Sequence, residues 1–256
     1  MAIKENSFNP VNMSVLTQDA FRTLRMNIAF SGQEKDIQTL VVTSSVPNEG
    51  KTSVSIGLGI AMAESGRRTL IIDCDCRKPT VGNRLRIRPE KTWLDVLYNH
   101  IPVDQAIVET QCPRLYFLDV EPGIAHSIEQ LSGFRFRKMV EGLRDKFGFI
   151  IFDTPPVGAF IDAATLAGYA DGTIMVISSG NQEVRLLKSS LEQIQKAGAN
   201  FLGVVLNKVM ISKASSYYKY GDYYYRGHKD VTAQKAAQSQ NPLIKKMSIL
   251  TVRRTR

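Results

Sequence analysis

The sequence predicts an α/β fold in which a mostly parallel β-sheet is covered by helices on both faces. Short, continuous apolar runs alternate with helical stretches of ten to fifteen residues, as is typical of parallel strands buried on both faces. The 256 residues suffice for one such domain, and 43% hydrophobic and 22% charged residues are ordinary for a globular protein. No apolar run approaches the ~20 residues that span a bilayer, and the N-terminus lacks a signal-peptide pattern. We therefore expect a cytoplasmic protein.

Each expected element follows from its apolar pattern and its end signals. In the first helix, Ala20, Leu24 and Ile28 recur every four residues, and Gly66 and Gly198 close two later helices. The expected strands are the apolar runs 40–42, 70–75, 115–120, 149–153, 174–177 and 202–206. The expected helices are 17–31, 54–64, 93–98, 134–147, 163–169 and 183–197.

A phosphate-binding loop joins the first strand to the second helix. The stretch from Ser45 to Thr52 fits the pattern G-x-x-x-x-G-K-[ST], with Ser45 in place of the first glycine. In such a loop the backbone N–H groups and the positive end of the helix dipole face a polyphosphate. Gly50 lets the backbone come close, Lys51 reaches the outer phosphates, and the Thr52 hydroxyl can bind Mg²⁺. The sequence thus predicts a P-loop NTPase-like domain with a nucleotide site formed by Ser45, Val46, Pro47, Asn48, Glu49, Gly50, Lys51, Thr52 and Ser53.

Four polar side chains stand at the predicted carboxyl ends of strands, beyond which ligands of parallel sheets bind. Asp73 and Asp75 close the second strand, Asp153 closes the fourth, and Asn207 follows the last. Asp153 is the expected partner of Mg²⁺, a hard cation held by carboxylates, waters and phosphate oxygens. Of Asp73 and Asp75, which share one side of a strand, one can serve the metal while the other accepts a proton from an attacking hydroxyl. Either can instead cap the following turn. The Asn207 amide can bind a purine edge or cap its loop.

Tyrosines are crowded into one short segment near the C-terminus. Six of the nine tyrosines fall within 217–225, among Gly, Ser and Asp residues and without strand or helix periodicity. Such a segment can be a sticky disordered stretch, a stacking platform for nucleic acid, or a set of phosphate acceptors on a flexible arm. The candidate acceptors are Tyr217, Tyr218, Tyr220, Tyr223, Tyr224 and Tyr225.

The positive charge is concentrated after this segment. Residues 226–256 hold eight Lys or Arg and one Asp, a net charge of +7 out of +9 for the whole chain. We therefore divide the chain into a domain at 1–211, a flexible tyrosine segment at 212–226 and a basic tail at 227–256. Leu243, Met247 and Leu250 have helical spacing in the tail, which favours contact with anionic lipid. Disorder without a partner is an equal alternative.

The first helix, at about 15–31, carries a charged stripe. Asp19, Arg22 and Arg25 recur every three residues and fall along one side. A solvated face is the ordinary interpretation of such a run, and a self-association surface is the alternative.

Three ordered motifs and the tyrosine cluster together resemble the bacterial protein-tyrosine kinases (BY-kinases) of capsule and exopolysaccharide synthesis. The Walker A motif of that family is matched by Ser45 to Thr52, including Pro47 and Glu49. The second acidic motif, an apolar run followed by D-x-D-x-R, is matched by 70–77, and the Walker B motif, an apolar run followed by D-x-P-P, by 150–156. The resemblance covers about 19–225.

The resemblance implies specific roles. Lys51 and Thr52 bind ATP phosphates and Mg²⁺, Asp75 and Asp153 support the metal, and Asp73 is the base toward tyrosine. It also implies autophosphorylation of the tyrosine cluster, homo-oligomeric rings and a cognate tyrosine phosphatase. A membrane-embedded chain-length regulator, here a separate chain, would activate the kinase and recruit it to the inner membrane face. Polysaccharide synthesis and export would be the regulated process.

The sequence also departs from that family. The helix motif E-x-x-R-x-x-R reads Asp19-x-x-Arg22-x-x-Arg25, with a shorter carboxylate, and 121–127 has lost most prolines of a Pro-rich loop. A partitioning or positioning ATPase of the ParA/MinD type is the main rival, but such proteins carry an extra lysine where this chain has Val46. A nucleic-acid binder is a third alternative, and it leaves three placed aspartates unexplained.

Overall fold

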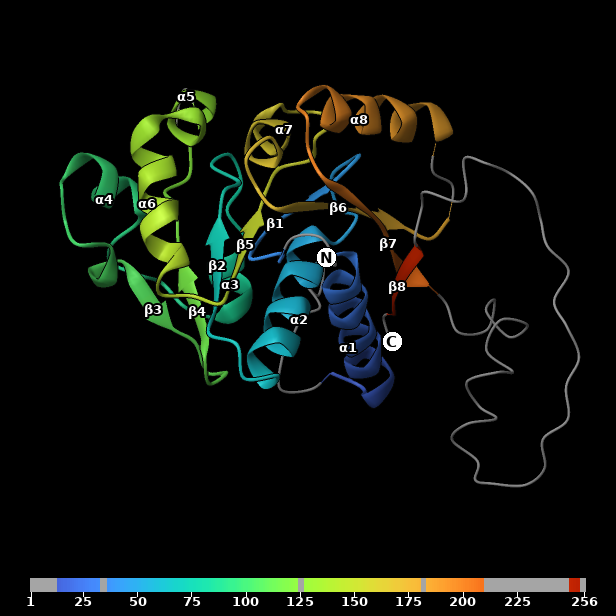
Figure 1. Cartoon of the computed structure of the whole chain (residues 1–256), viewed down its shortest axis with the longest axis horizontal. Coiled ribbons are helices and arrows are strands. Elements are labelled where there is room, and N and C mark those ends of the chain that lie inside the picture. Colours follow the sequence, from blue (N-terminus) through green and yellow to red (C-terminus); the bar gives the residue numbers. More distant parts are fainter. Residues whose placement is uncertain (1–12, 33–35, 124–126, 181–182, 210–248, 254–256) are drawn as a thin grey trace, which may run out of the picture.

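The computed structural model describes residues 13–32, 36–123, 127–180, 183–209 and 249–253, and it confirms the predicted α/β class (Figure 1). Within these residues, eight strands form one sheet in the order β3-β4-β2-β5-β1-β6-β7-β8. Neighbouring strands are parallel, except that the edge strand β3 runs antiparallel to β4. The strands are β1 (Thr39–Ser44), β2 (Thr69–Asp73), β3 (Ile107–Glu109), β4 (Leu115–Leu118), β5 (Phe149–Asp153), β6 (Gly172–Ser178), β7 (Phe201–Val209) and β8 (Ile249–Arg253).

Helices cover both faces of the sheet, as predicted. Helices α1, α2 and α3 pack on one face, whereas α4 to α8 pack on the other. The helical elements are α1 (Val15–Ser31), α2 (Lys51–Glu64), α3 (Val81–Leu85), α4 (Trp93–Tyr98), the short 3₁₀ helix η2 (Val103–Gln105), α5 (Ser127–Ser132), α6 (Phe134–Arg144), α7 (Asp162–Ala167) and α8 (Val184–Lys196). Among the described residues, no helix has the length and apolarity needed to cross a bilayer.

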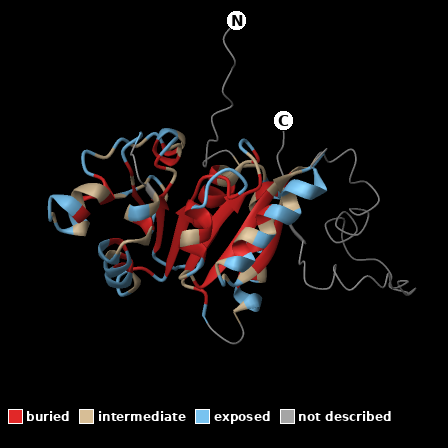
Figure 2. Cartoon of the chain, turned by 90° about the horizontal axis from the view of Figure 1, so that it is seen from above, coloured by how far each residue is buried: buried red, intermediate tan, exposed pale blue. Residues whose placement is uncertain are grey.

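The central strands are buried on both sides, which explains their continuous apolar runs. In β5, Ile150 and Phe152 belong to the core beside α6, whereas Ile151 belongs to the core beside α2. Figure 2 shows the sheet as a buried layer between partly exposed helices. Every core strand therefore needs apolar residues at consecutive positions.

Strand β2 ends two residues earlier than predicted. The chain turns after Asp73 because the carboxylate of Asp73 accepts the backbone N–H of Asp75, Thr80 and Val81. Asp75 therefore lies in the turn rather than on the strand, and the prediction that both aspartates share one side of a strand was wrong.

The C-terminal strand β8 was not predicted. It pairs in parallel with β7 at the edge of the sheet. Leu250 lies in this strand, so the helical spacing proposed for Leu243, Met247 and Leu250 was wrong at Leu250. Leu243 and Met247 lie outside the described residues.

Candidate active site

The predicted convergence at the carboxyl edge of the sheet is present. Strands β2, β5 and β1 are neighbours, and Asp73 of β2 is in register with Asp153 of β5. The loop after β1 reaches Asp153 through Thr52, and it reaches the end of β7 through a contact between Glu49 and Asn207. These residues therefore surround one region where α2 begins.

The phosphate loop has a backbone that depends on glycine. Gly50 has φ +98° and is the N-cap residue of α2. A Cβ atom at this position would lie 2.1 Å from Nδ2 of Asn207, so both its dihedral angle and its close packing exclude a side chain. The free N–H groups of the first turn of α2 then open toward an anion, as a phosphate site requires.

The Glu49 carboxylate supports this loop from inside. It is 1% exposed and accepts hydrogen bonds from the backbone N–H of Ser45 (2.9 Å), Val46 (3.0 Å) and Ser178 (3.2 Å). Two of these donors belong to the loop and the third to the end of β6. The side chain of Glu49 thus braces the loop against the sheet.

Asn207 and Lys208 hold the loop from the β7 side. The Asn207 amide donates to the backbone carbonyl of Glu49 at 2.9 Å, and the Lys208 ammonium donates to the carbonyl of Asn48. Asn48 and Lys208 both have positive φ, 64° and 57°, which is uncommon for residues other than glycine. The contacts of Asn207 thus match the loop-capping alternative rather than a purine contact.

Asp153, itself an expected partner of Mg²⁺, lies next to Thr52, whose hydroxyl is the other expected metal ligand. Its oxygens accept hydrogen bonds from the hydroxyls of Thr52 (2.7 Å) and Ser55 (2.8 Å). Burial raises the pKa of Asp153, while the nearby ammonium of Lys51 acts to lower it.

Mg²⁺ fits this donor set, because a hydroxyl and a carboxylate are hard oxygen ligands. The described residues contain no group of three or more His, Cys, Asp or Glu side chains that could hold a metal. A magnesium ion would therefore depend on Thr52, the nearby carboxylates and phosphate oxygens together.

Asp73 and Asp75 differ in exposure. Asp73 is fully buried, and burial followed by repulsion from Asp153 raises its pKa well above the ordinary range, while backbone hydrogen bonds act to lower it. Asp75 is half-buried, and burial likewise raises its pKa, against the hydrogen bond from the backbone N–H of Lys78 and the charge of Lys51. The turn-capping alternative therefore describes contacts of both aspartates, three for Asp73 and one, from the Lys78 N–H, for Asp75.

Several supporting residues escaped the sequence analysis. The hydroxyl of Thr80 lies 2.9 Å from that of Thr52, and the indole N–H of Trp93 donates to the backbone carbonyl of Asp73 at 3.0 Å. Arg77, part of the D-x-D-x-R pattern, forms a 2.8 Å ion pair with Asp162. A threonine or tryptophan well outside the loop carries no sequence signal that connects it to a phosphate site.

The charged stripe of α1 lies away from this site. Arg22 pairs with Asp19 at 3.1 Å, and Arg25 donates to the backbone carbonyl of Ala61 near the end of α2 at 3.0 Å. The ring of Phe21 packs on Gly57, where a Cβ atom would lie 2.1 Å from it. All three residues of the stripe therefore take part in contacts within the chain, and these contacts neither require nor exclude self-association.

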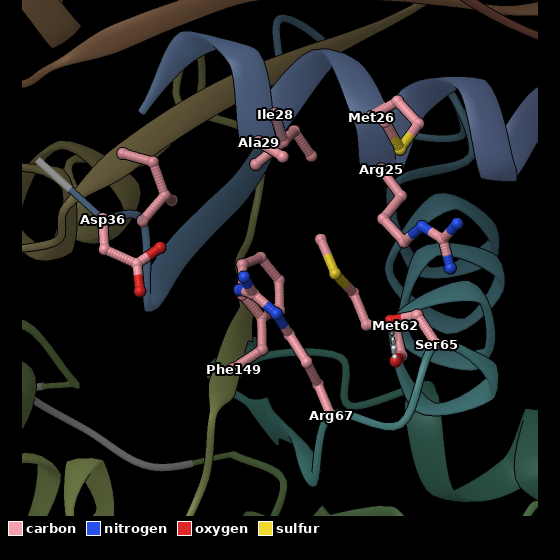
Figure 3. Close-up of a pocket in the computed structure, with 10 residues that line it drawn as sticks. Arg25, Met26, Ile28, Ala29, Asp36, Met62, Ser65, Arg67 and Phe149 are labelled. Carbon is pink, nitrogen blue, oxygen red and sulfur yellow. Dashed lines mark hydrogen bonds between the residues drawn. The ribbon is translucent and has the colours of Figure 1, made fainter. Parts of the chain in front are cut away.

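A separate pocket of about 250 Å³ opens between α1 and α2 (Figure 3). Arg25 of α1, Met62 of α2, Arg67 just before β2 and Phe149 at the start of β5 help to line it. It therefore lies at the amino ends of the strands, on the opposite edge of the sheet from the phosphate loop.

The tyrosine cluster at 217–225 lies outside the described residues.

Comparisons with known proteins agree with this geometry. A family model described as an AAA domain matches residues 38–204. The chain is 34% identical over 215 residues to the tyrosine-protein kinase CpsD of Streptococcus agalactiae. This match covers 84% of the chain and 91% of that protein. Among solved structures, the chimerical protein CapA2B2 is 30% identical with a TM-score of 0.71, covering 79% of the chain and 87% of that chain.

A MinD structure shares the fold alone. The septum site-determining protein MinD from Pyrococcus horikoshii, complexed with Mg-ADP, is 24% identical with a TM-score of 0.57, and covers 71% of this chain and 77% of its own. The kinase relatives are thus more similar in sequence and in structure.

Proposed function

Because the chain belongs to the family of bacterial tyrosine-protein kinases, with an AAA domain as its core, we propose that it transfers the γ-phosphoryl group of ATP to the tyrosines of 217–225. The observation that carries this proposal is the meeting of the phosphate loop, Asp73 and Asp153 at one edge of the sheet. The family membership favours a kinase over the ParA/MinD-type ATPase, which shares the fold but attacks water.

The phosphate loop binds and orients the nucleotide in this proposal. The N–H groups at the start of α2 donate hydrogen bonds to the phosphate oxygens, and Lys51 neutralises the outer ones. Thr52 and Asp153 would hold Mg²⁺, with Asp75 as a further ligand. A bound Mg²⁺ would supply charge neutralisation on the phosphate oxygens.

Phosphoryl transfer then needs a base for the acceptor. The phenol oxygen of a tyrosine bonds to the γ-phosphorus, the bond to the ADP oxygen breaks, and the phenol proton passes to a carboxylate. We assign this role to Asp73, as the family resemblance implies; burial raises its pKa above the ordinary range of a carboxyl, which makes it a stronger base. Asp73 is enclosed by its turn, so the turn must open before a phenol can approach.

The first prediction tests the activity directly. We expect wild-type protein incubated with Mg-ATP to carry several phosphotyrosines in the 212–226 peptide when that peptide is measured by mass spectrometry. Asp73→Ala should lower the incorporated phosphate about a hundredfold, because a positioned base contributes that much. ATP consumption without phosphotyrosine in the wild type would instead support an ATPase.

Asp75→Ala is the matched control for the choice of base. Both variants remove a carboxylate from the same turn, but the metal role proposed for Asp75 predicts that raised Mg²⁺ concentration partly restores Asp75→Ala and not Asp73→Ala. Restoration of Asp73→Ala alone would reverse the two assignments.

We also propose the partners that the family resemblance implies. These are a homo-oligomeric ring with contacts through Asp19, Arg22 and Arg25, a separate membrane-embedded chain-length regulator as activator, and a cognate tyrosine phosphatase. Polysaccharide synthesis and export would be the regulated process. Phosphorylation of the tyrosine segment would add strong negative charge and repel acidic neighbours, which is a physical route to ring disassembly.

The second prediction concerns recruitment to the inner membrane face. The net charge of +7 in 226–256 favours anionic lipid, at about 1 kcal/mol for each basic residue near the surface. Replacement of Lys229, Lys235, Lys245 and Lys246 by Gln changes no residue of β8. We expect this variant to co-sediment far less than the wild type with phosphatidylserine-containing liposomes. Equal binding of the two proteins would contradict lipid contact by the tail.

A further inference from the structure

A second cation lies beside the phosphate loop, on an element that the motif does not include. Arg84, on α3, donates from Nη1 to the hydroxyl oxygen of Ser53 at 2.9 Å. Ser53 directly follows Thr52 and is the third residue of α2, so it belongs to the first turn whose N–H groups open toward the phosphates. Arg84 is separated from Ser53 by 31 positions in the chain, and the turn around Asp73 brings it there.

The position of α3 is fixed independently of this contact. The carboxylate of Asp73 accepts the N–H of Val81, the first residue of α3, and the Thr80 hydroxyl contacts Thr52. Val81 and Leu85 are buried in the core that α2 also lines. The hydrogen bonds of this turn place the guanidinium of Arg84 at the start of α2, and this half-buried side chain is partly open to solvent.

The chemistry of the position fits an inner phosphate. In a phosphate loop, the backbone N–H groups of the loop lie beside the α- and β-phosphates, whereas Lys51 reaches outward to the β- and γ-phosphates. A guanidinium presents five N–H donors in a planar fork, so it can keep a hydroxyl contact and also bind a phosphate oxygen. Resting on the proposed function, we infer that Arg84 is a further nucleotide-binding residue that contacts the inner phosphates of ATP and ADP.

This role predicts a particular pattern of binding. A contact to the inner phosphates is made by ADP and ATP alike, so its loss weakens both by the same factor. It is present before and after transfer, so it adds uniform binding and leaves kcat unchanged. A contact to the γ-phosphate would instead affect ATP alone.

The third prediction uses Arg84→Gln, with Arg88→Gln as the matched control. Arg88 is an exposed arginine four residues further along the same segment, so its replacement removes the same charge. By isothermal titration calorimetry of the full chain, we expect Arg84→Gln to weaken both Mg-ADP and Mg-ATP about tenfold, and Arg88→Gln to change either less than twofold. In the kinase assay, KM for ATP should rise by a similar factor while kcat stays within twofold.

Other outcomes overturn the inference. Equal affinities for Arg84→Gln and Arg88→Gln would do so, as would a loss confined to ATP. If Arg84→Gln does not fold, Arg84→Lys keeps the charge without the fork and should weaken both nucleotides by about threefold; unchanged affinity would overturn the inference. A wild-type chain that binds neither nucleotide would overturn the proposed function itself, whereas a wild type that binds both, with Arg84→Gln unaffected, removes only the role of Arg84.

Discussion

Replacing Lys51 with Met is expected to lower autophosphorylation about a thousandfold, because the transferred phosphoryl group loses its principal protein cation. Lys51 is the first residue of α2, and its charge acts on both Asp75 and Asp153. Methionine keeps the aliphatic length of the side chain without the ammonium, so the fold should be retained. The measurement is phosphotyrosine formation with Mg-ATP, with thermal unfolding as the check on folding.

Lys91→Met is the matched control, because Lys91 is exposed and lies far along the chain from the loop. We expect it to retain wild-type activity. Near-normal activity in Lys51→Met would contradict the assignment of the phosphate loop, whatever the state of the other site residues.

The same variant decides which subunit phosphorylates which. Tyr220 is twelve residues beyond Lys208, and such a segment can extend to about 40 Å, enough to reach its own site or that of a neighbour. Lys51→Met, which keeps its tyrosines, is mixed with a chain in which the six clustered tyrosines are Phe. Phosphate on the Lys51→Met chain would demonstrate transfer between subunits, and its absence would indicate transfer within one chain.

The core of the fold could be predicted because its strands are buried on both faces. Runs such as 149–152 are apolar at every position, so they stand out from amphipathic helices. The elements that escaped prediction are short or depend on pairing. Strand β3 has three residues at the edge of the sheet, and α3 has five. Strand β8 pairs with β7 only after a long intervening segment, which local sequence patterns cannot reveal.

The site was predictable at the level of residue position but not of contact. The motif spacing alone places Asp153 at the end of a strand and Gly50 in the phosphate loop. The bond from the Ser178 N–H to Glu49, in contrast, joins positions 129 apart, and the sequence indicated Glu49 only as a residue that contacts ATP. Similarly, Asp73 at a strand end could be expected, whereas its three backbone donors depend on how the next turn folds.

Asp153→Asn should change stability and activity in opposite directions. Burial raises the pKa of Asp153 above its unfolded value, and its charge also raises the pKa of Asp73. At neutral pH the ionised carboxylate therefore costs folding free energy, which asparagine does not. We expect the free energy of unfolding of the variant to be about 1 kcal/mol higher than that of the wild type at pH 7 without nucleotide or metal. Its kinase activity should fall several hundredfold, because Asp153 is a proposed metal ligand.

The stability difference between Asp153→Asn and the wild type should depend on pH. A raised carboxyl pKa means that the folded chain binds the proton more tightly. The cost of Asp153 is therefore full above its folded pKa, declines as pH falls through that pKa, and is gone below the unfolded pKa. The stability advantage of Asp153→Asn, measured by thermal unfolding with EDTA, should therefore vanish below about pH 4, where Asp is protonated in both states. An advantage that persists there would have another cause.

Asp171 supplies the opposite case within the same fold. Burial acts to raise its pKa, but hydrogen bonds from Arg144 and Thr39 outweigh burial and lower it. Its ionised form therefore stabilises the fold above the unfolded pKa, and this contribution is lost as pH falls through the folded pKa. Asp171→Asn should destabilise the protein at pH 7 by about 2 kcal/mol. If Asp153→Asn also destabilised the protein at pH 7, the buried charge of Asp153 would not oppose folding, and the stability cost inferred for it would be wrong.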